Sequence, residues 1–448
     1  MISRSNLARQ YSLEQQRFLD THPRSRALYD RARKSLLEGV PMHWMKKWAG
    51  GFPVFVASAR GAYLTDVDGL QYLDLCLGDT GAMTGHAPPD TLEAIHRQAT
   101  RGITTMLPTE DSLWVAEELG RRFGLPHWQF ALSATDANRF AIRLARMITG
   151  RPRILVFNWC YHGTVDETLV ILQDGVPQMR PGNIGPAVNP VETTRVVEFN
   201  DLPALAEALS HGDVACILAE PAMTNIGIIH PDPGFLAAMS DLAARTGTLV
   251  VIDETHTLCA GPGGCTAAMN LHPDFVTVGK AIGAGVPGAA YGFSSKVAKA
   301  LESRIPVLDC DTGGIGGTLA GNSLSLAAMR ATLELVLTPE SYRRTIPMAA
   351  RFRSGVESVI AEYALPWIVK QLGCRVEYWF RPAPPRNGGE AAAAVDAELD
   401  RYMHLAALNR GILLTPFHNM ALIAPTVTES DIDRHSAVFR ESVEALVG

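Results

Sequence analysis

The middle of the chain alternates between short apolar runs and amphipathic segments. Between about residues 128 and 295, apolar runs of strand length are separated by longer segments with helical periodicity, such as 233–246. This alternation predicts an α/β domain with a mostly parallel, doubly wound sheet, because parallel strands need helical crossovers. The predicted strands are RILVF, ACILAE, LVVID, FVTVG and GAAYGF.

The regions on either side of this core also follow readable patterns. Ser12 and Gln15 fit a capping box for a helix within 12–38, and the stretch PVFVASARGAYLTDVDGLQYLDLC predicts short strands around an Asp-Val-Asp-Gly turn. Further helices are predicted at 89–101, at 110–123 and through LAGNSLSLAAMRATLELV. The segment RPAPPRNGG at 381–389 predicts an exposed loop.

A chain of 448 residues is longer than one ordinary domain. The patterns place a large domain at 81–335. We expect a small α+β domain built from both chain ends, with an N-terminal part at 1–80 and a C-terminal part at 336–448.

Composition narrows the range of partners and compartments. The net charge of −6 comes without a basic stripe, so nucleic acid is not an expected partner. No apolar run is long enough to span a bilayer, and the N-terminus lacks an apolar signal core, which favours a cytoplasmic protein. The seven cysteines are scattered without a CxxC pair, so neither a metal site nor a disulfide framework is expected.

The strongest chemical signal is an acid and a lysine that follow neighbouring predicted strands. Asp253 ends LVVID, and Lys280 follows FVTVG. Ligands of open α/β sheets bind at the carboxyl ends of the strands, where both side chains would lie. Pyridoxal 5'-phosphate enzymes need this pair: the lysine forms a Schiff base with the aldehyde, and the carboxylate keeps the pyridine nitrogen protonated.

Four further motifs have both a ligand-binding and a purely structural interpretation. The loop from Ser133, Ala134 and Thr135 to Asn138 opens a predicted helix, so it is either a phosphate site or a simple N-cap. Tyr161-His162-Gly163 places either an aromatic lid on a ring or a buried tyrosine in a loop.

Glu220, before Pro221, either arranges hydrogen bonds around a bound ring or bonds to loop amides. The glycine-rich run that ends at Thr318 is either a phosphate-binding loop or an unliganded turn. Each motif is weak alone, but their order along the chain is that of a fold-type I pyridoxal phosphate enzyme.

With these motifs in order, the chain resembles the class III aminotransferases, in particular the branch of glutamate-1-semialdehyde aminomutase and the β-amino acid (β-phenylalanine) aminotransferases. The resemblance covers nearly the whole chain. It is carried by GGFPVFVASARGAYLTDVDGLQYLDL, TGHAPPDTLEAI, SATDANRFAIRLAR, YHG, AEPAMTNIGIIHP, DET, VGKAIGAG, GTLAGN and GILLTP.

The resemblance implies roles for the catalytic pair and the residues around the ring. Lys280 would carry the cofactor and move a proton, and Asp253 would pair with the ring nitrogen. Tyr161 would stack on one ring face, and Thr255, where relatives usually have valine, would pack on the other.

The resemblance also implies a phosphate site shared between subunits. Ala134 and Thr135 would bind the phosphate, and Thr318 would reach it from a partner subunit. We therefore expect a homodimer with the site at its interface.

The chain departs from its relatives around the expected substrate site. Trp159 stands where relatives have glycine, and His256 stands where many have glutamine or methionine. The two arginines that bind substrate carboxylates in relatives are absent, with His43 or Trp44 at the first position and Phe417 at the second.

Three explanations of the missing arginines stay open. Another group such as Arg375 or His43 holds the carboxylate, or the substrate is bulky and apolar, or the donor is an amine without a nearby carboxylate. Asp79 faces the site in relatives. Met83, with the aromatic residues above, predicts an apolar pocket lining.

Three functions are compatible with these patterns. The leading hypothesis is an aminotransferase that moves an amino group from an amino acid or amine to a keto acid by ping-pong chemistry through Lys280. The alternative is an isomerase on the same scaffold, either an aminomutase or an amino acid racemase. A non-catalytic or nucleotide-binding α/β protein is the third, against which the Asp253–Lys280 pair and the lack of a GxGxxG or GxxxxGK[ST] motif argue.

Overall fold

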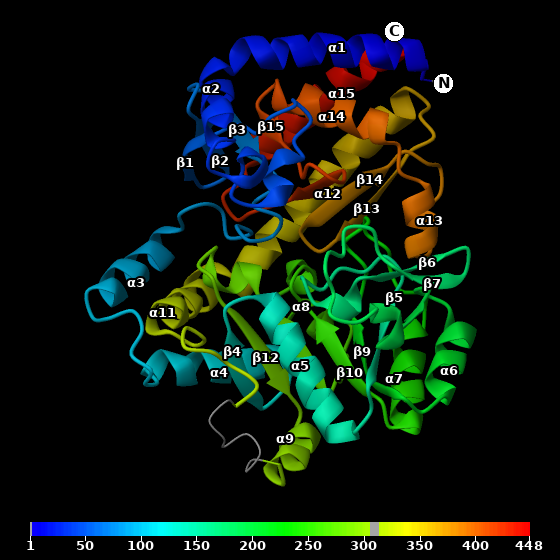
Figure 1. Cartoon of the computed structure of the whole chain (residues 1–448). Coiled ribbons are helices and arrows are strands. Elements are labelled where there is room, and N and C mark those ends of the chain that lie inside the picture. Colours follow the sequence, from blue (N-terminus) through cyan, green and yellow to red (C-terminus); the bar gives the residue numbers. More distant parts are fainter. Residues whose placement is uncertain (1, 305–312) are drawn as a thin grey trace. The chain divides into compact units, whose positions relative to one another are not determined.

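The computed structural model describes residues 2–304 and 313–448 (Figure 1). The chain forms two compact units. The small unit holds residues 1–88, 343–384 and 394–448, and the large unit holds residues 89–342 and 385–393.

The large unit is built on a seven-stranded sheet in the order β4-β12-β11-β10-β9-β5-β8. β12 is antiparallel to both neighbours, and the other pairings are parallel, so the predicted mostly parallel α/β sheet is confirmed. Every residue of β9 and β10 is buried, as expected for strands covered on both faces. The strands are β4 (His127–Ala131), β5 (Arg153–Phe157), β8 (Thr194–Val197), β9 (Val214–Ala219), β10 (Leu249–Asp253), β11 (Phe275–Val278) and β12 (Ala289–Phe293).

Two helices of the large unit end at glycines with a left-handed backbone conformation. α4 and α5 end at Gly124 and Gly150, which adopt φ values of 72° and 69° that a side chain disfavours. The apolar face of α5 packs on the sheet through Ala137, Ala141 and Leu144. The helices are α3 (Pro89–Ala99), α4 (Glu110–Phe123), α5 (Ala134–Thr149), α6 (Leu202–Ser210), α7 (Phe235–Thr246), α8 (Gly264–Ala268), α9 (Ser295–Glu302), α11 (Ser323–Ala331) and α13 (Gly388–Ala393).

The small unit contains two small sheets and several helices. The first sheet has the order β1-β2-β3-β15 and the second β13-β14-β16, so each combines strands from distant parts of the chain. Its strands are β1 (Val56–Arg60), β2 (Tyr63–Asp66), β3 (Gln71–Asp74), β13 (Ile368–Leu372), β14 (Arg375–Trp379), β15 (Ile412–Leu413) and β16 (Met420–Leu422), and its helices are α1 (Arg4–Thr21), α2 (Pro23–Ala32), α14 (Ala397–Leu408) and α15 (Glu429–Val447). α12 (Pro339–Glu362) begins in the large unit and continues here.

Two local predictions are wrong. Ser12 lies inside α1 and donates its hydroxyl to the carbonyl of Ala8, and the helix is capped by Ser3, whose hydroxyl accepts from the amide of Asn6. The predicted exposed loop at 381–389 ends early, because Gly388 is buried and begins α13. A Cβ on Gly388 would lie 2.0 Å from the carbonyl oxygen of Asn158, so a close backbone contact replaces the expected loop.

Candidate active site

Asp253 and Lys280 lie at the carboxyl ends of the neighbouring parallel strands β10 and β11, as their sequence positions predict. Asp253 is the last residue of β10. Lys280 follows β11 and opens a 3₁₀ turn with a left-handed φ of 49°. A lysine in this region of φ is uncommon, and such backbone strain concentrates at functional positions.

Asp253 is a buried carboxylate held by three donors. Its Oδ2 accepts from Asn138 Nδ2 at 2.8 Å and lies 2.9 Å from His162 Nδ1, and its Oδ1 accepts from the amide of Thr255 at 3.0 Å. Burial alone would raise the pKa of Asp253, but these contacts, led by His162, hold it well below its ordinary value. The carboxylate therefore keeps its negative charge inside the protein.

His162 lies beside this carboxylate, with its Nδ1 2.9 Å from Asp253 Oδ2. Burial alone would lower its pKa, but Cys160 and the Asp253 carboxylate raise it well above its ordinary value. Its Nε2 is buried and has no hydrogen-bond partner among the residues that the structure describes. A buried polar atom of this kind, beside a charged acid, fits a polar ligand group at this end of the sheet.

Two glycines bring the predicted motifs together at the N-terminus of α5. A Cβ on Gly163 would lie 2.0 Å from Thr135 Oγ1, and one on Gly279 would lie 3.0 Å from the Cβ of Ala134. The loop with Tyr161 and the turn with Lys280 therefore both rest against the first turn of this helix. Ser133 caps this helix by accepting from the amide of Asp136, and helix N-termini of this kind suit anions.

His256 lies beside the lysine, and Thr255 lies beside the acid. The distance between Lys280 Nζ and His256 Nε2 is 2.7 Å. Thr255 is buried, and its hydroxyl has no hydrogen-bond partner within the described residues. His256 therefore contacts the predicted catalytic lysine, and the amide of Thr255 contacts the predicted catalytic acid.

Glu220 is a second buried acid, but its environment differs. Its carboxylate accepts from the amide and hydroxyl of Thr224 at 3.0 and 2.5 Å. Burial raises its pKa to about 7, although His162 and Thr224 oppose that shift. Glu220 therefore takes up a proton at a higher pH than an ordinary carboxyl group does.

Glu254, next to Asp253, has a structural role. Its carboxylate accepts from Thr257, Cys265 and Thr266, and a Cβ on Gly264 would lie 2.1 Å from it. The Glu254 carboxylate therefore holds the turn after β10 against α8 through these hydrogen bonds, which gives it a structural role.

The predicted substrate residues fall in different places. In the small unit, His43 is exposed and pairs with Glu38, and Trp44 packs against Phe417 with ring centroids 5.7 Å apart.

Two other predicted substrate residues of the small unit, Arg375 and Met83, are buried, at 0% and 1% exposure. Asp79 has a left-handed φ of 50°. In the large unit, Trp159 also has a left-handed φ, of 64°.

Arg375 belongs to a strand whose polar side chains are enclosed in the small unit. On the same strand, Glu377 Oε1 lies 2.9 Å from His418 Nδ1. Asn419 donates to Asp400 at 2.9 Å, and burial raises the pKa of Asp400 to about 6. A fully buried Arg375 is a poor match for the predicted carboxylate clamp.

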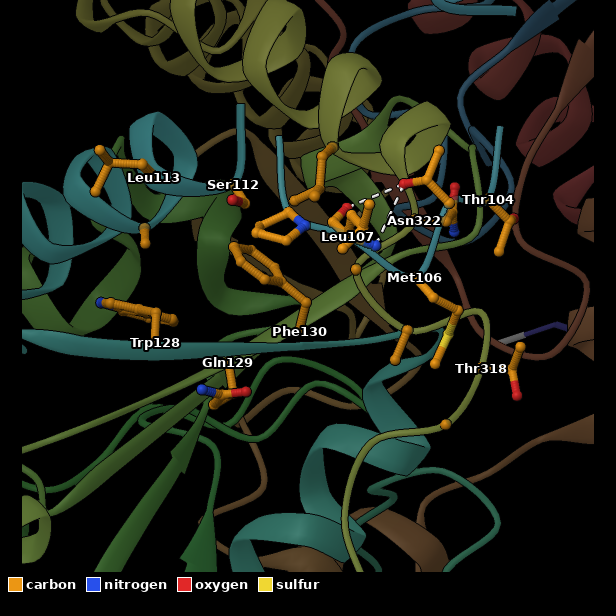
Figure 2. A pocket seen from close by; sticks show the side chains of 17 residues that line it. Thr104, Met106, Leu107, Ser112, Leu113, Trp128, Gln129, Phe130, Thr318 and Asn322 are labelled. Atoms are coloured by element: carbon orange, nitrogen blue, oxygen red, sulfur yellow. Dashed lines mark hydrogen bonds between the residues drawn. The ribbon is translucent and has the colours of Figure 1, made fainter. Parts of the chain in front are cut away.

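Thr318 is exposed and lines a pocket of about 530 Å³ in the large unit (Figure 2). The pocket lies between α4, β4 and the segment before α11, and neither Asp253 nor Lys280 lines it. It is bordered by exposed apolar side chains that include Met106, Leu107 and Leu113, at 74, 72 and 63% exposure.

Asn138 contacts the buried acid, although its sequence position predicted no role for it. Its amide nitrogen donates to Asp253, and its carbonyl oxygen accepts from Thr277 at 2.6 Å. The available signal was an asparagine on the buried face of an amphipathic helix, where an uncompensated polar group is costly. No cluster of three or more His, Cys, Asp or Glu side chains suited to a metal ion occurs in the described ranges.

Comparison with known proteins agrees with this geometry. The family model of the class III aminotransferases matches residues 44–441. The chain belongs to the class III aminotransferase family. It is a pyridoxal phosphate-dependent enzyme of fold type I.

The relatives of this class III chain include both isomerases and transaminases. A glutamate-1-semialdehyde 2,1-aminomutase from Sorangium cellulosum is 35% identical, covering 95% of this chain and 97% of the relative. A glutamate-1-semialdehyde aminomutase structure from Pseudomonas aeruginosa PAO1, in complex with PMP, is 47% identical with a TM-score of 0.97 over 99% of each chain. A β-phenylalanine aminotransferase structure from Variovorax paradoxus is 26% identical with a TM-score of 0.87, covering 98% of this chain and 97% of that one.

Proposed function

We propose that this class III enzyme is an isomerase that relocates an amino group within one small substrate, as an aminomutase does. The observation that carries the proposal is a charged Asp253 and Lys280 at the carboxyl ends of neighbouring strands, in a chain 47% identical to an aminomutase structure over 99% of its length. The proposal replaces the aminotransferase as the leading hypothesis, because the most similar relatives above are named as aminomutases.

The residues at the site fit pyridoxal phosphate. Lys280 would bind its aldehyde, Asp253 its ring nitrogen and the amides after Ser133 its phosphate, with Tyr161 and Thr255 against the two ring faces. Thr255 and His162 each offer a buried polar atom without a partner in the described chain. When bound, the cofactor supplies an electron sink that makes a substrate C–H bond acidic.

The side chains of this chain would then handle charge and protons. Asp253 holds a negative charge at a fixed place, which costs no reorganisation during the reaction. Lys280 Nζ takes a proton from the substrate and returns it at another carbon. His256 Nε2, 2.7 Å from Lys280 Nζ, keeps that nitrogen in position.

Transamination is the second candidate. It shares the early proton transfers and is favoured by the 26% identical β-phenylalanine aminotransferase and by a 28% identical ω-transaminase structure from Sphaerobacter thermophilus, with a TM-score of 0.86 over 95% of this chain and 98% of that one. The region of the missing semialdehyde-type arginine, VPMHWMKKW, also argues against a substrate bound as in the tetrapyrrole aminomutase.

We further propose that the enzyme is a homodimer in which Thr318 contacts the phosphate bound by the partner subunit. The exposed apolar side chains around the pocket in Figure 2 support a covered surface next to Thr318. Light scattering of the purified protein tests this, and a monomer would contradict it.

The discriminating experiment supplies one substrate at a time and no acceptor. Glutamate-1-semialdehyde, α-amino acids, β-amino acids and simple amines are each incubated with the holoenzyme, with K280A as control. Repeated turnover of one compound into its positional isomer supports the proposed isomerase, whereas turnover into its mirror isomer shows a racemase instead. A single turnover that stops after one carbonyl product per site, and restarts when a keto acid is added, shows a transaminase instead.

A further inference from the structure

One arginine of the large unit contacts a carbonyl oxygen and the ring of a tryptophan. Arg180, just after the hairpin of β6 (Val170–Gln173) and β7 (Val176–Met179), donates from Nη1 to the carbonyl oxygen of Cys160 at 2.7 Å. The centre of its guanidinium lies 5.0 Å from the ring centroid of Trp159. Within the described ranges, no carboxylate forms an ion pair with Arg180.

Arg180 is partly buried. Burial lowers its pKa, while Cys160 and Tyr161 oppose that shift. Partial burial of a guanidinium without a counter-charge is unfavourable, and this cost falls when an anion binds. The guanidinium offers further donors in a planar fork suited to a carboxylate.

The platform beneath Arg180 is strained and specifically held. Trp159 has a φ of 64°, a region that a bulky side chain avoids. Asn225 Nδ2 donates to the carbonyl oxygen of Trp159 at 3.0 Å, which fixes this conformation. The chain thus keeps a tryptophan where glycine is less strained, and the tryptophan ring stacks with the arginine.

Arg180 is connected to the cofactor site through one short loop. The carbonyl to which it donates belongs to Cys160, which precedes Tyr161, and His162 follows at 2.9 Å from Asp253. A ligand bound at Arg180 therefore meets the same loop that would cover the cofactor ring.

We propose that Arg180, which lies over Trp159, binds a carboxylate of the substrate. The inference rests on the proposed function and adds the residue that would hold this carboxylate. Arg180 acts by binding and takes no part in proton transfer.

The test compares a carboxylate probe with its neutral counterpart on the holoenzyme. Glutarate and glutaramide are titrated into wild type, R180Q, R180K and R195Q, with binding followed by tryptophan fluorescence and by displacement of the cofactor absorbance band. Arg195 is the matched control because its guanidinium already pairs with Asp213 at 2.7 Å. The spectrum of the bound cofactor verifies that each variant is folded.

We expect R180Q to weaken glutarate binding about 10- to 100-fold, the value of a charge-assisted hydrogen bond, and to leave glutaramide binding unchanged. R180K should fall between wild type and R180Q, because an ammonium keeps the charge but loses the fork. R195Q should match wild type.

Three results would overturn the inference. They are equal binding of glutarate and glutaramide by wild type, unchanged glutarate binding in R180Q, and an equal loss in R195Q. The proposed function fails separately, if wild type binds glutarate through Arg180 but no test compound is isomerised.

Discussion

Two buried polar clusters in this protein have similar residue types, but the pKa of the central acid is shifted in opposite directions. In the large unit, Asp253 receives bonds from His162, Asn138 and the Thr255 amide, and its pKa lies below the ordinary value. In the small unit, Asn419 donates one bond to Asp400, whose pKa burial raises to about 6. Each cluster contains an acid, an asparagine and a histidine.

The difference shows what makes a buried acid useful for chemistry. Donors determine whether the acid keeps its charge, since desolvation alone favours the neutral form. Glu377 also belongs to the small-unit cluster: its Oε1 contacts His418 at 2.9 Å, and its Oε2 has no partner among the described residues. Asp253 therefore keeps its negative charge to a lower pH than Asp400, which takes up a proton near pH 6.

The largest expected effect comes from removing the charge at Asp253. In D253N the shape is kept, but a neutral amide cannot hold a protonated ring nitrogen. Turnover should fall at least about 100-fold, the usual cost of losing one preorganised electrostatic contact. Steady-state assays on D253N and the matched variant E377Q measure this, and a loss in E377Q as large as that in D253N would erase the contrast between the clusters.

A smaller effect is expected when a donor to the charged acid is removed. N138A takes one hydrogen bond from Asp253 and leaves the Thr277 hydroxyl without its acceptor. We expect a loss of about 1–3 kcal/mol in the free energy of unfolding, measured by urea titration of the cofactor-free protein at pH 7. N419A is the counterpart in the small unit and should cost less, because Asn419 Oδ1 already lacks a partner in the described chain; equal losses would contradict the account.

These particular residues show how far the sequence could predict the structure. The strand-end positions of Asp253 and Lys280 follow from apolar runs and the rule for parallel sheets, so the sheet and this pair were predicted. The network around Asp253 was not, because the contact from Asn138 joins segments far apart in sequence and depends on which helix face is buried. Arg180 was missed as well, because the proposal for it depends on its having no carboxylate partner among the described residues, which periodicity cannot show.

Helix boundaries show the same limit at a local scale. α4 ends at Gly124, as predicted for the helix at 110–123, and α5 also ends at a glycine, Gly150. The capping box at Ser12 was wrong because Ser3, nine positions earlier, caps a helix that runs through Ser12. Serine and glutamine three residues apart also occur inside helices, so the pattern alone cannot distinguish the two cases.

The third prediction concerns buried neutral histidines of the small unit. Burial lowers the pKa of His435 to about 3 and that of His404 to about 4. Because an unfolded histidine titrates near 6.5, the unfolded chain binds more protons below that pH and stability falls as the pH drops from 6.5 toward 4. Each histidine should contribute a slope of about 1.4 kcal/mol per pH unit in this window.

H435F tests the slope directly. His435 stacks on Phe352 with ring centroids 4.1 Å apart, so a phenylalanine can take its place. The free energy of unfolding of H435F should depend less steeply on pH between 6.5 and 4 than that of wild type. Identical slopes would show that His435 is protonated in the folded protein.

The central claim, that a charged acid and Lys280 together form a pyridoxal phosphate site, is tested most directly by locating the cofactor. The purified protein is incubated with pyridoxal phosphate, reduced with borohydride, digested and analysed by mass spectrometry, with K280A treated in parallel. The account predicts one cofactor per chain, on the peptide that contains Lys280, and no label at this position in K280A. A label on other lysines, or none, would contradict it.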